Sequence, residues 1–209
     1  MVETYSVNKK PLSPEQTRIL ALDSIVDRLD LAALFPRSQP LEVELGSGDG
    51  SFLIQYAAAH PDANFLGVER LLGRIRKIDR KSHRAGLENI RLIRLEAAYV
   101  LEFLLPKHSA QAIHVYFPDP WPKRKHRKNR LINERFVELA RKALQPGGTV
   151  YLRTDDADYF AQMTSVFGAS PWFAEIETPS SLSDLQTDFE RDFLARGIST
   201  RRSAWRLKE

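Results

Sequence analysis

The segment from Phe117 to Arg130, FPDPWPKRKHRKNR, combines three kinds of side chain that could act together. Asp119 and Trp121 stand between prolines, and six of the eight residues 123–130 are Lys or Arg. A carboxylate beside an indole suits a flat polar ring, and the dense cations suit phosphate groups. The segment therefore predicts an enzyme that acts on a base within a nucleic acid.

The positive charge of the chain is concentrated in this same segment. Lys and Arg number 31 against 27 Asp and Glu, a formal net charge of +4. Without the six basic residues of 123–130 the totals become 25 against 27. Such clustering is typical of a surface that binds phosphates, although a solvated loop that aids solubility is the plainer alternative.

Other residue types exclude several kinds of chemistry. The chain has no cysteine, which removes disulfides, thiolate metal ligands and the covalent thiol adduct used at pyrimidine C5. No metal site is expected, because no ligand spacing links His60, His83, His108 and His114. We find no leader-like segment and no apolar run of membrane-spanning length, so we expect a cytoplasmic protein without membrane contact.

A second group of residues, ELGSGDG from Glu44 to Gly50, joins an apolar run directly to a helical pattern. Gly46 and Gly48 allow a tight turn and close approach of the backbone to a cofactor at the helix N-terminus. The spacing differs from the dinucleotide pattern, and Glu44 favours a ligand with a cationic amine over a pyrophosphate. S-adenosylmethionine fits this description, and a tight turn beside surface acids is the alternative.

Two further acids follow the next apolar runs. Glu69 lies 23 positions after Gly46, where doubly wound folds bind ribose hydroxyls. Glu96 and Ala97 follow the third run, and we expect them beside the adenine of the same cofactor.

Alternating strands and helices would position these groups. Apolar runs predict strands at 41–45, 64–69, 90–95, 113–117, 149–153, 172–177 and 199–207. Helical patterns lie near 51–59, 71–85, 97–104, 131–144, after Asp155, and in 178–196. This order predicts a parallel sheet covered on both faces. Its ligand crevice lies at the carboxyl ends of the strands, so Asp119 should face the pocket of Glu44 and Glu69.

The N-terminal region is predicted separately. Residues 1–12 are polar, and we expect them to be flexible. The sequence SPEQ from Ser13 has the pattern of a helix start, and apolar residues up to Leu29 predict a helix through this segment. Residues 146–148 (PGG) predict a tight turn before the fifth strand. Because we find no linker or repeat, residues 1–209 are expected to form one domain.

Together these motifs resemble a known family. FPDPWPKRKHRKNR, ELGSGDG and the TDFE segment from Thr187 closely resemble the bacterial tRNA (guanine-N7-)-methyltransferases, from about Leu12 onward. The resemblance implies a Rossmann-like class I methyltransferase fold, with a central, mostly parallel seven-stranded sheet flanked by helices. It also implies transfer of a methyl group from S-adenosylmethionine to a variable-loop guanine of tRNA.

The resemblance implies roles for individual residues. Those it assigns to the cofactor are Glu44, Glu69, Glu96 and Asp119, with Asp119 also regarded as catalytic. Those it places at the substrate are Lys123, Asp155, Thr187, Phe189 and Glu190. Those it places against RNA are Lys125, His126, Arg127, Lys128 and Arg130.

The chain departs from the family pattern at three positions. Glu96 stands where Asp or Asn is common, Asn129 replaces an arginine, and Phe189 replaces a frequent tyrosine. The longer acid alters the contact expected on the adenine side. The other two remove a phosphate contact and a hydroxyl.

Some alternatives stay open on the sequence. Trp121 could stack on the base or pack the loop. A stripe of Arg74, Lys77, Lys81 and Arg84 could bind RNA or form a solvated helix face. The rival functions are a methyltransferase for another RNA, a protein or a small molecule, a nicotinamide-dependent oxidoreductase, and an RNA-binding module without catalysis.

Overall fold

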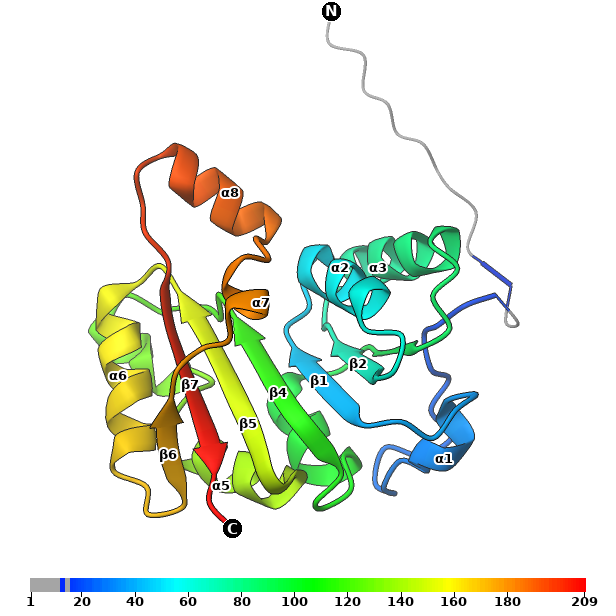
Figure 1. Cartoon of the computed structure of the whole chain (residues 1–209), viewed down its shortest axis with the longest axis horizontal. Coiled ribbons are helices and arrows are strands. Elements are labelled where there is room, and N and C mark those ends of the chain that lie inside the picture. Colours follow the sequence, from blue (N-terminus) through cyan, green and yellow to red (C-terminus); the bar gives the residue numbers. More distant parts are fainter. Residues whose placement is uncertain (1–11, 14–15) are drawn as a thin grey trace, which may run out of the picture.

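A seven-stranded sheet forms the centre of the computed structural model, which describes residues 12–13 and 16–209 (Figure 1). The strands are β1 (Leu41–Leu45), β2 (Asn64–Val68), β3 (Ile90–Ile93), β4 (Ala110–Tyr116), β5 (Leu144–Thr154), β6 (Phe173–Ile176) and β7 (Arg201–Leu207). Their order is β3-β2-β1-β4-β5-β7-β6. The first five in the chain pair in parallel, and β7 runs antiparallel to both neighbours. This confirms the predicted mostly parallel seven-stranded sheet of the class I methyltransferase fold.

Helices cover both faces of the sheet. The longer ones are α2 (Ser51–Ala59), α3 (Leu72–Arg84), α5 (Glu134–Ala143) and α6 (Ala157–Gly168), and the shorter ones are α1 (Leu31–Leu34), α4 (Ala97–Tyr99), α7 (Ser180–Ser183) and α8 (Asp188–Ala195). A π-helical turn over Val100–Leu104 continues α4. Apolar residues of α2 and α3 form one buried cluster, and those of α5 and α6 belong to another. The sheet is therefore the middle layer of three.

The prediction of a long helix from Ser13 to Leu29 is wrong. The chain from Arg18 to Leu20 instead runs beside β3, where Ile19 forms a parallel bridge with Leu92. Leu92 N donates to Arg18 O at 2.8 Å, and Leu20 N donates to Leu92 O at 2.8 Å. Because β3 lies at the sheet edge, this segment satisfies backbone groups that would otherwise stay unpaired. The predicted flexible segment 1–12 lies, apart from Leu12, outside the described residues.

The predicted turn at residues 146–148 lies inside β5 as an irregularity. Ala110 of β4 faces Leu144, and Ala112 faces Thr149, so β5 has extra residues between these two pairs. Gly147 adopts a φ of 75°, a left-handed conformation that favours glycine.

The carboxyl ends of the parallel strands share one edge of the sheet, and Figure 1 shows α8 projecting beyond the ends of β4 and β5. This arrangement places the loops after β1, β2, β3 and β4 together, where a doubly wound fold binds ligands. Among the described residues, no helix is both long enough and apolar enough to cross a membrane.

Candidate active site

A cavity of about 700 Å³ opens at the carboxyl ends of the strands. It is lined by Gly46 after β1, Glu69 after β2, Glu96 after β3 and Asp119 after β4. Lys128 of the basic segment lines it too. The structure thus places the glycine loop, the aspartate and the cationic segment around one space, as the sequence predicted for their positions.

The glycine loop depends on left-handed backbone at two positions in particular. Gly46 has a φ of 81°, and no atom lies within 4 Å of the place where a side chain would begin. Gly50 has a φ of 77°, and a Cβ there would lie 3.0 Å from the Ile78 side chain. A larger residue at either position would be strained, and at Gly50 it would also press on α3.

Glu69 ties the end of β2 to the glycine loop. Gly48 N donates to its Oε2 at 3.0 Å, and Leu71 N donates to its Oε1 at 2.7 Å. The carboxylate is buried and fixed by two backbone amides. Its remaining lone pairs can accept further hydrogen bonds, and contact with ribose hydroxyls stays a prediction.

Glu44 is buried under the glycine loop and does not line the cavity. Burial raises the pKa of its carboxyl to about 8, against the hydrogen bond of Ser47 and the attraction of Arg153. Its Oε2 has no hydrogen-bond partner among the described residues. A buried acceptor without a donor is costly, and the ammonium of S-adenosylmethionine would both donate to this oxygen and favour the ionised form of the carboxyl. The residues present therefore fit the predicted cofactor.

Glu96 and Ala97 follow β3, the strand at one end of the sheet, and both line the cavity. Glu96 is exposed and pairs with Arg70, with 3.2 Å between Oε1 and Nε. Ala97 lines the cavity at the start of α4. An exposed ion pair of this kind contributes little stability, so Glu96 is free to exchange Arg70 for a ligand.

The loop that carries Asp119 has an unusual backbone on both sides. Phe117 has a φ of 52° and Trp121 a φ of 43°, although neither is glycine. Each such residue costs about 1–3 kcal/mol and persists only where the surroundings hold it. Asp119 is exposed, and its Oδ1 accepts from Trp121 N at 3.3 Å. The ring of Trp121 meets His126 edge-on, with 5.8 Å between centroids, and also lines the cavity.

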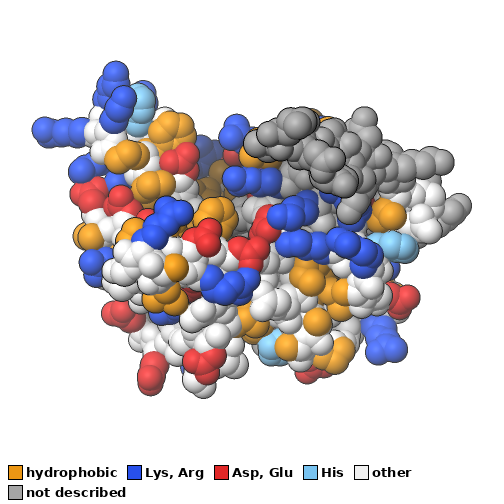
Figure 2. All heavy atoms as spheres, turned by 90° about the horizontal axis from the view of Figure 1, so that it is seen from above, with side chains coloured by type: hydrophobic (Ala, Val, Ile, Leu, Met, Phe, Trp, Pro, Cys, Tyr) orange, Lys and Arg blue, Asp and Glu red, His pale blue; other side chains and the backbone are white. Residues whose placement is uncertain are grey.

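The basic segment forms a 3-10 helix over Arg124–Asn129. Lys123, Lys125, Arg127 and Lys128 are exposed, and Arg127 pairs with Asp158 at 3.1 Å. Figure 2 shows Lys and Arg side chains gathered at several places on the face seen from above, the side toward which α8 projects. These exposed cations can reach a polyanion without moving the rest of the fold.

Arg130 contradicts the predicted phosphate contact. Its side chain is only 2% exposed, and its guanidinium donates to Pro120 O, Gln162 Oε1 and Asp158 Oδ2 at 2.6–2.8 Å. It also lies over the Tyr159 ring, 4.7 Å from the centroid. The N–H groups that would bind a phosphate are already hydrogen-bonded to acceptors of the protein.

Glu190 likewise contradicts a direct contact with substrate. It is fully buried and pairs with Arg153 and Arg202, each at 2.8 Å. It also forms a reciprocal capping box with Thr187, because Glu190 N donates to Thr187 Oγ1 and Thr187 N donates to Glu190 Oε2. These two residues hold the start of α8 in place.

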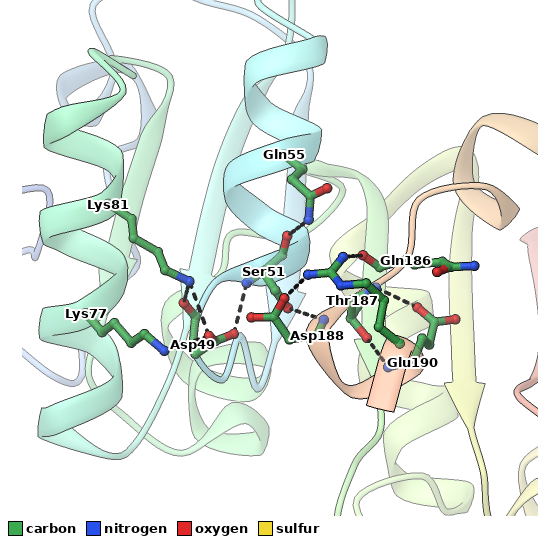
Figure 3. A network of polar contacts seen from close by, with 10 residues as sticks. Asp49, Ser51, Gln55, Lys77, Lys81, Gln186, Thr187, Asp188 and Glu190 are labelled. Carbon is green, nitrogen blue, oxygen red and sulfur yellow. Dashed lines mark hydrogen bonds and ion pairs between the residues drawn. The ribbon is translucent and has the colours of Figure 1, made fainter. Parts of the chain in front are cut away.

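Other residues of the same segment remain near the loops at this edge of the sheet. Phe189 is 44% exposed, and its ring lies 3.9 Å from the position of a Cβ at Gly48. Asp188 N donates to Ser51 Oγ at 3.3 Å, which joins α8 to α2 (Figure 3). Asp155 is half-buried directly after β5. Phe189 and Asp155 therefore stay available as substrate residues.

The basic stripe on α3 divides between two roles. Lys77 and Lys81 bind Asp49 of the glycine loop, at 2.9 and 3.2 Å (Figure 3). Arg74 lines the cavity and Arg84 is exposed. The two lysines thus stabilise the loop, and only the arginines are left for RNA.

Arg153 is the important residue that the sequence reasoning missed. It is buried in β5, donates to Leu182 O and Leu185 O as well as Glu190, and lies 4.3 Å from the centroid of the Tyr116 ring. An arginine within the apolar run TVYLR is a signal for a buried acid partner, but it does not say which acid.

Comparisons with known proteins agree with this geometry. The sequence profile of the Methyltransf_4 family, described as "Putative methyltransferase", matches residues 38–202. A tRNA (guanine-N(7)-)-methyltransferase of Nitrosococcus oceani is 38% identical over 181 residues, covering 86% of this chain and 75% of the relative. One of Halorhodospira halophila is 35% identical over 185 residues, covering 86% and 80%. In some other relatives the covered share is smaller, at 62% and 66%.

Solved structures support the fold alone. The crystal structure of the 16S rRNA methyltransferase KamB superposes with a TM-score of 0.62 at 13% identity, covering 88% of this chain and 95% of that one. An O-methyltransferase of Thermotoga maritima that depends on S-adenosylmethionine gives a TM-score of 0.56 at 12% identity, covering 83% and 61%. With the Nitrosococcus and Halorhodospira relatives, which are 35–38% identical and covered to three quarters or more, these findings show that the chain belongs to the tRNA (guanine-N(7)-)-methyltransferase family.

Proposed function

We propose that this chain transfers a methyl group from S-adenosylmethionine to N7 of a variable-loop guanine in tRNA. The observation that carries the proposal is the shared cavity, which Asp119 lines together with Gly46, Glu69 and Lys128. A cofactor pocket alone would suit many methyltransferases. The adjoining cations favour a substrate that carries phosphates. Because tRNA acts in the cytoplasm, the proposal includes that location.

The chemistry asks mainly for positioning. When bound, S-adenosylmethionine supplies an activated methyl group on a sulfonium. Guanine N7 carries a free lone pair in the neutral base, so no proton must leave before transfer. The chain has to hold N7 in line with the methyl group, and such positioning can supply roughly 7–11 kcal/mol of barrier reduction.

Each of the proposed cofactor residues would contact a different part of S-adenosylmethionine. Glu44 would meet the ammonium, Glu69 the ribose hydroxyls, and Glu96 with Ala97 the adenine side. Gly46 and Gly48 leave the backbone open to close approach. The support is the unpartnered Oε2 of Glu44 and the fixed carboxylate of Glu69.

Asp119 would orient the guanine. Its carboxylate is exposed at the cavity, where it can accept hydrogen bonds from the N1 and N2 donors of the base. It can also stabilise the positive charge that methylation places on the purine. Asp155 and Phe189 would fix the other edge of the base, with Lys123 at its phosphate. In this scheme no residue acts as a strong general base.

The experiment is methyl transfer from labelled S-adenosylmethionine to bulk tRNA, with and without prior ribonuclease treatment. We expect incorporation that ribonuclease abolishes and that Asp119→Ala lowers by at least 100-fold at saturating tRNA. Label that enters protein or a small molecule, or persists after ribonuclease treatment, would favour the rival methyltransferase. Near-normal turnover in Asp119→Ala would show that the aspartate does not orient the base.

A further inference from the structure

Arg130 stands out because the sequence places it in a cationic segment and the structure buries it. Among the basic residues of 123–130 its side chain is the buried one. Its Nε and both Nη atoms each donate to a protein acceptor, and its own backbone O accepts from Asn133 Nδ2 at 3.0 Å. Burying an arginine in this way costs much desolvation, which the fold accepts only with several compensating bonds. The position therefore needs an explanation other than RNA binding.

The contact between Arg130 and Pro120 joins the two ends of the basic segment. Arg130 Nε donates to Pro120 O at 2.8 Å, across ten positions of the chain. Pro120 directly follows Asp119, and residues 121–129 form an excursion between the two partners. The bond therefore joins the two ends of this excursion, and it holds the Asp119 loop in place.

The other end of the Arg130 guanidinium is anchored on α6. One Nη donates to Gln162 Oε1 at 2.8 Å, and the other donates to Asp158 Oδ2 at 2.6 Å. The group lies over the ring of Tyr159, whose hydroxyl accepts from Ile132 N at 2.9 Å. The guanidinium therefore connects α6, which packs on the sheet, to the backbone of Pro120. Its planar, forked shape allows it to bind both at once.

The loop needs such a hold, because its backbone is unfavourable on both sides of Asp119. Phe117 and Trp121 both have positive φ values, and they relax unless contacts maintain them. Pro118 and Pro120 restrict the backbone between them but cannot fix its direction relative to the sheet. The bond of Arg130 to Pro120 O supplies that direction.

We propose that Arg130 is a positioning residue, which latches the Asp119 loop to α6 so that the carboxylate points into the cavity. The inference rests on the proposed function for the role of Asp119, but the latch itself is a property of the fold. If Arg130 has this role, loss of its forked guanidinium should lower turnover more than it weakens the binding of tRNA.

The test is Arg130→Lys, which keeps the charge but cannot span Pro120, Gln162 and Asp158 together. We expect kcat to fall by about 10- to 100-fold, equal to roughly 1.4–2.8 kcal/mol in the barrier. The Kd for tRNA and its dependence on salt should stay within twofold of wild type. Lys125→Ala, which removes an exposed cation from the same segment, should instead weaken tRNA binding and lower the salt slope by about one.

A second measurement does not depend on the substrate. Backbone hydrogen exchange of a peptide covering residues 117–123 should be at least tenfold faster in Arg130→Lys than in wild type. Arg141→Lys, on the surface of α5, is the matched control and should leave this exchange unchanged. If Arg130→Lys does not fold, Asp158→Asn and Gln162→Ala each remove one anchor and should give smaller changes in the same direction.

The outcomes separate the latch from the proposed function. A weaker Kd with a lower salt slope and unchanged kcat would show that Arg130 binds phosphate, and would overturn the latch. Unchanged exchange in the loop would also overturn it. If wild type makes no 7-methylguanosine but the exchange of the loop still rises in Arg130→Lys, the latch stands and the proposed function fails.

Discussion

Replacing Glu44 by Gln should make the ligand-free protein more stable at alkaline pH. Glu44 is buried, and its Oε2 has no hydrogen-bond partner among the described residues. Burial raises the pKa of the carboxyl from 4.5 to about 8. In the ligand-free protein the charged form is therefore the unfavourable one, and a neutral amide of the same shape avoids it.

The size and the sign follow from the two pKa values. At about 1.4 kcal/mol per pH unit, the interval from 4.5 to about 8 corresponds to roughly 5 kcal/mol. Because the folded-state pKa lies above the unfolded-state value, this stability is fully present below pH 4.5 and is lost as the pH rises through about 8. Glu44→Gln should thus differ from wild type by less than about 1 kcal/mol at pH 5 and by up to about 5 kcal/mol at pH 8.5.

Urea unfolding of the two proteins at pH 5 and pH 8.5 measures this difference. Glu138→Gln, an exposed acid on α5, is the control and should give no trend with pH. The same variant of Glu44 should lose affinity for S-adenosylmethionine, since it loses the negative charge proposed to meet the ammonium. A stability difference between Glu44→Gln and wild type that is the same at both pH values would refute the argument.

The remaining predictions concern the supports of the site. Glu190→Ala leaves Arg153 buried without its acid partner and should cost about 3–5 kcal/mol in the free energy of unfolding; a loss under about 1 kcal/mol in urea unfolding would contradict this. Gly50→Ala should cost roughly 2–4 kcal/mol, because of its positive φ and the contact with Ile78, whereas Gly73→Ala in α3 has open space and should cost nothing; equal midpoints for the two variants would be the adverse result. If about six phosphates are bound, tRNA affinity should fall by on the order of 10³-fold between 50 and 200 mM salt, and a flat response in a filter-binding titration would show that the basic segment is not a docking surface.

The predicted features that the structure confirms are those with local signals. The glycine loop and the mostly parallel sheet follow from apolar periodicity, and the position of Asp119 follows from the rule that ligands bind at the carboxyl ends of parallel strands. The strand at 41–45 agrees with β1 at both ends. These inferences need no knowledge of distant partners.

The predictions that failed depend on contacts with residues far away in the sequence. The predicted N-terminal helix fails because Arg18 and Leu20 pair with Leu92, more than seventy positions away, which the local pattern cannot show. Arg130 and Glu190 have the charges that suit RNA and substrate, but Asp158 and Arg202 claim them in the fold. Whether a charged residue faces a ligand or a buried partner is decided by tertiary structure, and sequence motifs cannot tell the two apart.

The most direct measurement is the identity of the modified nucleoside in tRNA after incubation with S-adenosylmethionine and the protein. Digestion of the tRNA and mass spectrometry should yield 7-methylguanosine from the variable loop with wild type, and none above background with Asp119→Ala. A methylated nucleoside of any other kind, or unmodified tRNA from the active protein, would contradict the account.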